Sequence, residues 1–139
     1  MQDFSKKMSI VLRDDLASWQ LTNTVGHIAA YLGNKMSEPF DTGANFVSKD
    51  GINFPRNYQF AVVVLSATPN DLKKLAAKLY NSDLCWIAYT QEMIDLIDDN
   101  ELVQALSLVP ADEMNILGIG VFADKDKLKE LTGRLHLWK

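Results

Sequence analysis

Two groups of polar side chains follow short apolar stretches and contain the residue types that bind or process ligands. One group follows residues 8–12 and the other follows residues 84–89. In chain order, their members are Arg13, Asp14, Asp15, Thr90, Gln91 and Glu92. A guanidinium orients an anionic group through paired hydrogen bonds, and a carboxylate serves as a general acid or base. The two groups indicate a ligand site, with solvated loop residues and helix caps as the equally weighted alternative.

A third set of polar side chains has helical spacing. Asn23, His27 and Tyr31 are four residues apart, so on a helix they share one face. Such a row can line a pocket beside the end of a strand. A capping asparagine and a half-buried histidine are the alternative interpretation.

The single cysteine and the two histidines indicate structural roles more than catalysis. Cys85 lies inside an apolar stretch, where a thiol is usually buried and unreactive. His27 and His136 are too few and too far apart in the sequence to predict a zinc site. We therefore expect no metal and no intramolecular disulfide.

Gly118, Gly120 and Ala123 match the spelling of a dinucleotide-binding fingerprint. Both glycines lie inside an apolar stretch, however, and no further strand with an acidic residue follows about 20 positions later. We interpret the glycines as places where a helix packs closely on a strand, and we expect no cofactor.

Hydrophobic patterns predict the elements that must position these residues. Strands are expected at 8–12, 60–65, 84–89 and 115–122. Helices are expected from Thr22 or Asn23 to Gly33, from Thr68 to Leu79, at 91–97, from about 100 to 109, and at 124–133. The alternation predicts a layered, mostly parallel α/β sheet with helices on both faces.

The expected arrangement brings the candidate residues together. We expect one domain over residues 1–139, with a turn-rich excursion at 38–56 that carries a small edge hairpin. The valine-rich stretch 60–65 should be a central strand, and the first three strands should be neighbours. Ligand crevices in open α/β sheets form at the carboxyl ends of strands. Asp14 and Gln91 should then lie near each other, with His27 reaching toward them.

Composition excludes several classes of protein. The hydrophobic fraction is 47% and the charged fraction 23%, as in ordinary globular domains. No apolar run approaches the roughly 20 residues of a membrane span, and no secretory signal is visible, so we expect a cytoplasmic protein without membrane contact. A net charge of −4 predicts weak or no binding to nucleic acid.

The order of several motifs resembles the class II peptidyl-tRNA hydrolases. The matching segments are Arg13-Asp14-Asp15-Leu16, Gly26-His27, Leu117-Gly118-Ile119-Gly120 and the run from Leu131 to Leu137. Still closer is the resemblance to a bacterial domain-of-unknown-function family, numbered two thousand, that shares the hydrolase fold. Its features here are Asp14-Asp15-Leu16, Trp19, Leu21-Thr22-Asn23, His27, Thr90-Gln91-Glu92-Met93 and Pro110-Ala111-Asp112.

The resemblance implies a three-layer α/β/α sandwich on a mixed sheet of about four strands. It does not carry the hydrolase activity over. The hydrolases have a lysine-containing, glycine-rich segment where this chain has Ala17-Ser18-Trp19-Gln20, and Asp-Ala-Gly-x-Thr where it has Tyr89-Thr90-Gln91-Glu92-Met93. Trp19 and Met93 would make the crevice more apolar, which suits a small ligand better than a phosphate backbone.

Three functions remain open from the sequence. The leading hypothesis is a domain that binds a small molecule or peptide at the crevice, with Arg13 orienting an anionic group and Glu92 or Asp14 as acid or base. The alternative is a hydrolase for peptidyl-tRNA or aminoacyl esters with a rearranged site. The third is a structural homodimer without a ligand.

Overall fold

The computed structural model describes residues 3–36 and 44–139. Its strands are β1 (Asp3–Arg13), β2 (Phe46–Val47), β3 (Asn53–Phe54), β4 (Phe60–Ala67), β5 (Cys85–Thr90), β6 (Ile116–Asp124) and β7 (His136–Leu137). Its helices are α1 (Ser18–Lys35), α2 (Pro69–Leu79), α3 (Gln91–Asp95), α4 (Asp99–Ser107), the short 3₁₀ helix η1 (Ala111–Glu113) and α5 (Lys125–Thr132). The protein is therefore a mixed α/β structure.

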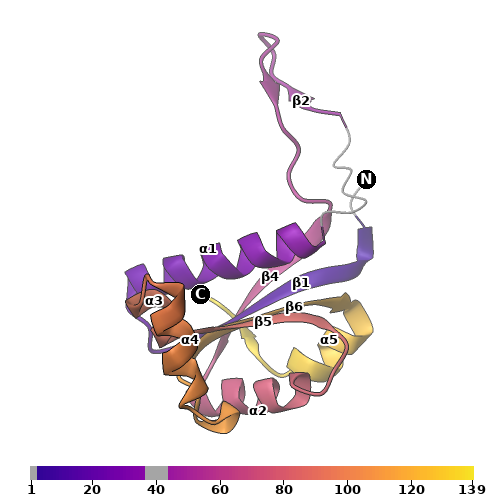
Figure 1. The fold of residues 1–139 in the computed structure, drawn as a ribbon. Coiled ribbons are helices and arrows are strands. Elements are labelled where there is room, and N and C mark those ends of the chain that lie inside the picture. The colour runs from indigo at the N-terminus through magenta and orange to yellow at the C-terminus, as the bar shows by residue number, and fades with distance from the viewer. Residues whose placement is uncertain (1–2, 37–43) are drawn as a thin grey trace.

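Five strands form one mixed sheet in the order β5-β6-β1-β4-β7. β1 pairs with β4 in parallel, whereas β6 pairs antiparallel with both β1 and β5, and β7 pairs antiparallel with β4. β1, β4 and β5 consequently run in one direction, and their carboxyl ends lie at one edge of the sheet. Figure 1 shows α3 and α4 at that edge.

The sheet is mixed, and two other expectations about it were wrong. β5 is not a neighbour of β1, because β6 lies between them. Only one of the four strand pairings is parallel, so the sheet is not mostly parallel, and it has five strands because β7 adds to β4. A two-residue strand such as His136–Leu137 has no periodicity that a sequence could reveal.

Helices pack against both faces of this sheet. α1 contacts β6, β5 and β1, and α2 and α5 lie together on the opposite face (Figure 1). One apolar cluster joins α1 to the sheet through Ile28 and Leu32. The other joins α2 and α5 to it through Leu72, Leu79 and Leu128. Burial of these side chains is the main stabilising contribution to the layers.

The glycines of β6 allow the close contact with α1 that the sequence suggested. A Cβ atom at Gly118 would lie 2.9 Å from Thr24 Cγ2, and one at Gly120 would lie 2.8 Å from Leu32 Cδ1 and still closer to Ile28. These are side chains of α1, so they pack directly against the backbone of β6 at the two glycines. The glycines serve packing, as expected.

β4 is not the central strand that its valines predicted. It lies next to the short β7, and α1 packs over β1, β5 and β6. Val62 is 47% exposed as a result. The strand that is buried along nearly its whole length is β6, from Ile116 to Ala123.

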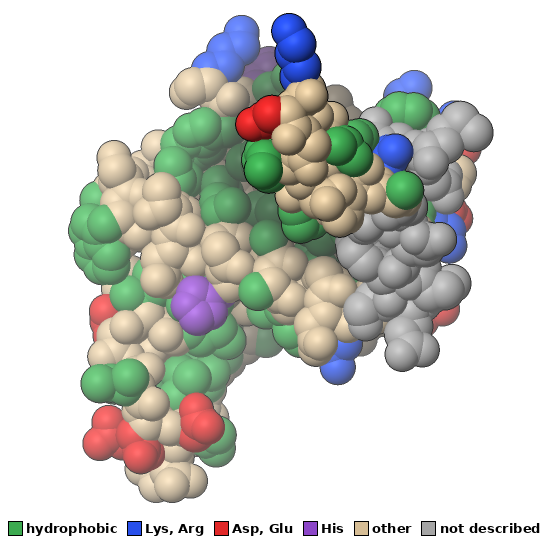
Figure 2. Space-filling view, turned by 90° about the horizontal axis from the view of Figure 1, so that it is seen from above, with side chains coloured by type: hydrophobic (Ala, Val, Ile, Leu, Met, Phe, Trp, Pro, Cys, Tyr) green, Lys and Arg blue, Asp and Glu red, His purple; other side chains and the backbone are tan. Residues whose placement is uncertain are grey.

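Figure 2 looks onto α1 and shows hydrophobic side chains in a hollow beside it, with acidic side chains at the corner of α4.

α1 begins earlier than predicted. Its N-cap is Ala17, whose backbone N–H donates to Gln20 Oε1 at 3.1 Å, and Asn23 lies inside the helix. The start of α2 agrees with the prediction, because Thr68 Oγ1 accepts from the Asp71 N–H and Pro69 follows the cap.

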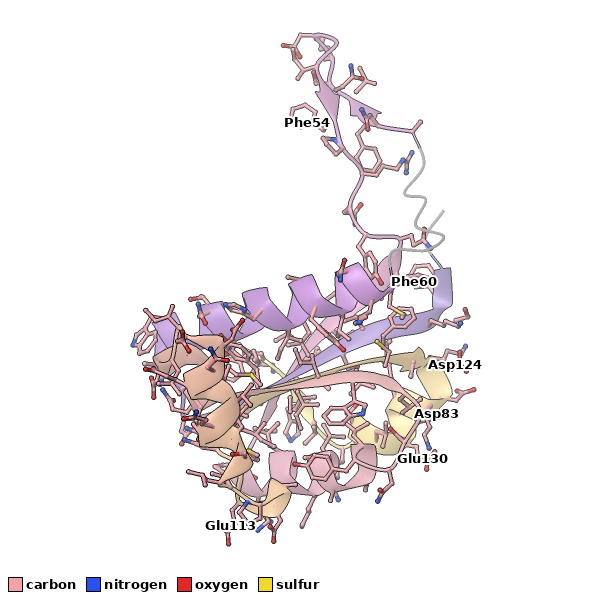
Figure 3. The ribbon with its side chains drawn as sticks, in the orientation of Figure 1. Phe54, Phe60, Asp83, Glu113, Asp124 and Glu130 are labelled. Carbon is pink, nitrogen blue, oxygen red and sulfur yellow. The ribbon has the colours of Figure 1, made fainter. Side chains whose placement is uncertain are left out.

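The expected hairpin within 38–56 exists, but not at the edge of the main sheet. β2 and β3 form a separate two-stranded sheet that projects from the body, with Phe54 far from Phe60 (Figure 3). Residues 38–43 of the excursion lie outside the described residues. Along the described part of the chain, no helix has the length and apolar character needed to cross a membrane.

Candidate functional site

The carboxyl edge of the sheet collects polar residues from β1, β5 and the start of β6. β1 ends at Arg13 and β5 ends at Thr90, and β6 begins between them at Ile116. Glu113 of η1 lies at this same end in Figure 3, whereas Asp83 and Asp124 lie at the other end. The site residues predicted from β1 and β5 are thus at one edge but are separated by one strand.

Arg13 is held by its own neighbours. Its Nε donates to Asp15 Oδ1 at 2.6 Å, and its Nη1 donates to Asn115 Oδ1 at 2.6 Å. The arginine side chain is only 18% exposed. A guanidinium engaged in this way organises the edge, with Nε and Nη1 already used among its five N–H donors.

Asn115 connects the two predicted groups. Its side chain accepts from Arg13, and its backbone carbonyl accepts from the Gln91 N–H at 3.0 Å. Gln91 also accepts from Gln20 Nε2 at 3.3 Å and donates to Asp95 at 2.8 Å. The sequence placed Asn115 in the fourth strand and did not suggest this role. The only available signal was its position directly before an apolar run.

Asp14 lies on the other side of β1, away from the Gln91 group. Its backbone N–H donates to the Ala67 carbonyl of β4 at 2.9 Å. Its side chain lines a hollow of about 580 Å³ together with Ser66, His136 and Trp138. Asp14 and Gln91 share neither a hydrogen bond nor a pocket, because β6 lies between the strands that they follow.

Two members of the polar row on α1, Asn23 and His27, contact Tyr89 of β5. Tyr89 donates from its hydroxyl to Asn23 Oδ1 at 3.1 Å, and the His27 ring stacks on the Tyr89 ring with centroids 4.8 Å apart. Burial raises the pKa of the Tyr89 hydroxyl, so it remains a donor at neutral pH. His27 itself is exposed. Neither a capping asparagine nor a half-buried histidine describes this arrangement.

Thr90 faces an apolar pocket at the end of β5. The hollow has a volume of about 210 Å³, and its lining is Tyr80, Trp86, Ala88, Thr90, Met93, Leu106, Ala111, Met114 and Ile116. Thr90 is 4% exposed, and its Oγ1 has no hydrogen-bond partner among the described residues. At the rim, the Tyr80 hydroxyl donates to the Ala111 carbonyl at 3.0 Å. Burial, and then the charge of Asp112, raise the pKa of Tyr80.

Glu92 has a second buried atom of this kind. Its Oε2 is buried without a hydrogen-bond partner within the described part of the chain. It does not line the apolar pocket, although the adjacent Met93 does. Of the eight predicted site residues, Thr90 is thus the one that the structure places in an apolar cavity.

Metal and thiol chemistry have no visible basis here. The described residues contain no group of three or more His, Cys, Asp or Glu side chains that could hold a metal ion. Cys85 packs partly buried against the apolar cluster under α1. Burial raises the pKa of its thiol, and the charge of Lys35 lowers it by less. A protonated, half-buried thiol is a poor nucleophile.

Fold and site together define a mixed α/β protein with polar residues at one sheet edge and an apolar pocket beside them. A family model described as "Protein of unknown function (DUF2000)" matches residues 6–139, so the chain belongs to this family. A solved structure of a protein of unknown function from Agrobacterium tumefaciens strain C58 has a TM-score of 0.84 with it. That match has 23% identity and covers 99% of this chain and 100% of the other. At this identity the likeness concerns the fold. No curated protein matches the sequence.

Proposed function

We propose that the protein binds a small, largely apolar molecule carrying one hydrogen-bond acceptor, in the pocket at the carboxyl end of β5. The observation that carries the proposal is the Thr90 hydroxyl, which is buried in an apolar lining and has no hydrogen-bond partner in the part of the chain that the structure describes. Leaving such a group unpaired costs about 1–3 kcal/mol. A carbonyl or ether oxygen of a ligand would remove this cost while the rest of the ligand fills the pocket.

Part of the wall of this pocket comes from α3 and α4, which bury no residue. Leu106 comes from α4, a helix with no buried residue, and Met93 comes from the five-residue α3. Elements with few buried contacts open at low free energy. The present volume of about 210 Å³ suits a fragment-sized ligand, since typical ligand pockets have roughly 300–1,000 Å³. A shift of α4 would admit a larger molecule or an apolar peptide side chain.

We also propose that the fold is a three-layer α/β/α sandwich of the class II peptidyl-tRNA hydrolase type. Within that fold the pocket lies where α/β proteins commonly hold ligands, outside the carboxyl ends of strands. The aminoacyl-ester or peptidyl-tRNA hydrolase remains the second candidate. It is favoured by the exposed imidazole of His27, held against Tyr89 next to the same edge.

A pair of probes of equal shape tests the binding proposal. Acetophenone and α-methylstyrene, in which a CH2 group replaces the carbonyl oxygen, differ in the acceptor that Thr90 would contact. We expect the protein to prefer acetophenone by up to about tenfold, because one hydrogen bond contributes about 0.5–1.5 kcal/mol. The Thr90→Val variant, which keeps the shape, should lose this preference. Titration by NMR with labelled Met methyl groups measures both affinities.

The control for this test is Thr22→Val. Thr22 lies on the exposed side of α1, and its hydroxyl bonds to the Ser18 and Trp19 carbonyls of its own helix. It should bind both probes as the unaltered protein does. Equal affinity of the unaltered protein for the two probes, or methyl shifts that avoid Met93 and Met114, would contradict the proposal.

The hydrolase alternative has its own test. With a net charge of −4 and acidic residues on α4, we expect tRNA to bind weakly and to dissociate at physiological salt. Filter binding at 50 and 150 mM salt measures this. Salt-tolerant binding of N-acetyl-aminoacyl-tRNA, with hydrolysis that His27→Ala abolishes, would replace the binding proposal by the alternative.

A further inference from the structure

A second hollow lies on the α5 face of the sheet, near the opposite edge from the Thr90 pocket. It has a volume of about 390 Å³ and is called the lysine hollow here. Its lining is Lys7, Ser9, Val63, Leu65, Lys125, Asp126, Lys129, Thr132, Gly133, Leu135 and Leu137. The residues come from β1, β4, α5 and β7, with the turn between α5 and β7. None of them lines the pocket at β5.

Ser9 forms the floor of the lysine hollow. It lies in the middle of β1, opposite Val63 of β4 and Val121 of β6. Its side chain is 1% exposed, and Oγ has no hydrogen-bond partner in the described segments. A hydroxyl buried among valines is unfavourable unless something bonds to it. The donor at the floor therefore points to an acceptor that enters the hollow.

Three lysines line the hollow around this floor, and the described residues form no ion pair with any of them. Lys7, Lys125 and Lys129 make no ion pair among the described residues, whereas Lys127 on the same helix pairs with Glu130 at 3.5 Å. Asp126 is the one acidic residue of the lining. The hollow thus carries a net positive charge in a protein whose overall charge is −4. Such a local inversion of sign attracts anions.

The remaining wall is apolar. Val63 and Leu65 of β4 and Leu135 and Leu137 near β7 line it, and Leu137 is 61% exposed. A free inorganic anion would leave these side chains in water. A ligand with an anionic head and an apolar tail would contact both parts of the lining.

We propose that the lysine hollow binds an amphiphilic anion, a carboxylate or phosphate monoester joined to a short apolar chain. The head group contacts the lysines and accepts a hydrogen bond from Ser9, and the chain lies along the leucines of β4 and β7. This site is separate from the Thr90 pocket and does not depend on the function proposed for it.

Calorimetric titration with decanoate, octyl phosphate, decanol and inorganic phosphate tests the inference on the full chain. We expect decanoate or octyl phosphate to bind at least tenfold more tightly than decanol or inorganic phosphate. The affinity should fall as salt rises, because the contacts are charge-assisted. The preferred head group distinguishes a carboxylate ligand from a phosphate ligand.

Three variants locate the site. Lys129→Gln should weaken binding about fivefold or more, and Ser9→Ala should weaken it while the protein stays at least as stable, since an unpaired buried hydroxyl is removed. Lys73→Gln is the charge-matched control on α2, and it should bind as the unaltered protein does. Equal binding of decanol and decanoate, or equal losses in Lys129→Gln and Lys73→Gln, would overturn the inference. So would the absence of binding by both anions at millimolar concentration.

Discussion

The side chain of His27, for which the sequence left open a pocket-lining role and a half-buried position, lies on the surface of the fold. It is exposed, and its ring contact is the stacked Tyr89. Asn23 completes the row by accepting from the Tyr89 hydroxyl. The row orders the surface of α1 next to the candidate site without contributing to the core.

Replacing His27 by alanine should therefore affect stability little. An aromatic pair contributes about 0.5–1.5 kcal/mol beyond burial, which is the upper limit of the expected loss. Urea unfolding measures the difference. A loss near 3 kcal/mol would show that the imidazole has buried contacts instead.

The candidate site was predictable in part at this scale. The position of Thr90 at a strand end could be predicted, because polar residues after an apolar stretch indicate such an end, and its role in a site stays a prediction. Its partners in the pocket, such as Tyr80 and Met114, were not predictable, because they come from distant segments that only the fold assembles. The role of Asn115 could not be predicted for the same reason.

At the scale of elements, the contact between α1 and β6 sets the spacing of one layer. Gly120→Ala should destabilise the protein by about 1–3 kcal/mol, since a methyl group there overlaps Ile28 and Leu32 of α1. Gly26→Ala in α1 is the control, because nothing lies within 4 Å of a Cβ added there. It should stabilise by about 0.4–1 kcal/mol through the unfolded chain. Thermal unfolding of both variants measures the contrast, and equal effects would contradict it.

α4 should respond to mutation locally. Asp98 caps it by accepting from the N–H groups of Asn100 and Glu101. Removing the cap by Asp98→Ala weakens the helix by about 1 kcal/mol. Because α4 buries no residue, hydrogen exchange should accelerate within Asp99–Ser107 while the global unfolding midpoint barely moves. A matching loss of global stability would show that α4 is part of the cooperative core.

The elements themselves were largely visible in the sequence, and their arrangement was less so. The N-cap Thr68 followed by Pro69 marked the start of α2, because that local chemistry suffices to begin a helix. The order of strands depends on pairing between distant segments. No local pattern told that β6 would pair with both β1 and β5.

For the whole molecule, alkaline pH should reduce stability. Burial raises the pKa of Tyr58, Tyr80, Tyr89 and the Cys85 thiol in the folded state. The folded protein then binds more protons than the unfolded chain once pH exceeds the unfolded pKa values, about 8.5 for Cys and about 10 for Tyr. Stability is complete below that range and falls as pH rises through it.

Urea midpoints at pH 7, 9 and 10 measure this dependence. Tyr89→Phe should flatten the decline, since the phenylalanine ring has no proton to lose. A midpoint that stays constant or rises between pH 7 and 10 would contradict the assignment of these groups as buried acids.

The position of β6 also has a consequence for how the chain is made. β6 lies between β1 and β5, yet it is the last of the three to leave the ribosome. Met8 pairs with Phe122, and contacts of such large sequence separation form slowly. A nascent chain that has not reached Ile116 exposes unpaired strand edges on both sides of the gap, which promotes aggregation. Until β6 has emerged, the edges of β1 and β5 that it will cover stay unpaired.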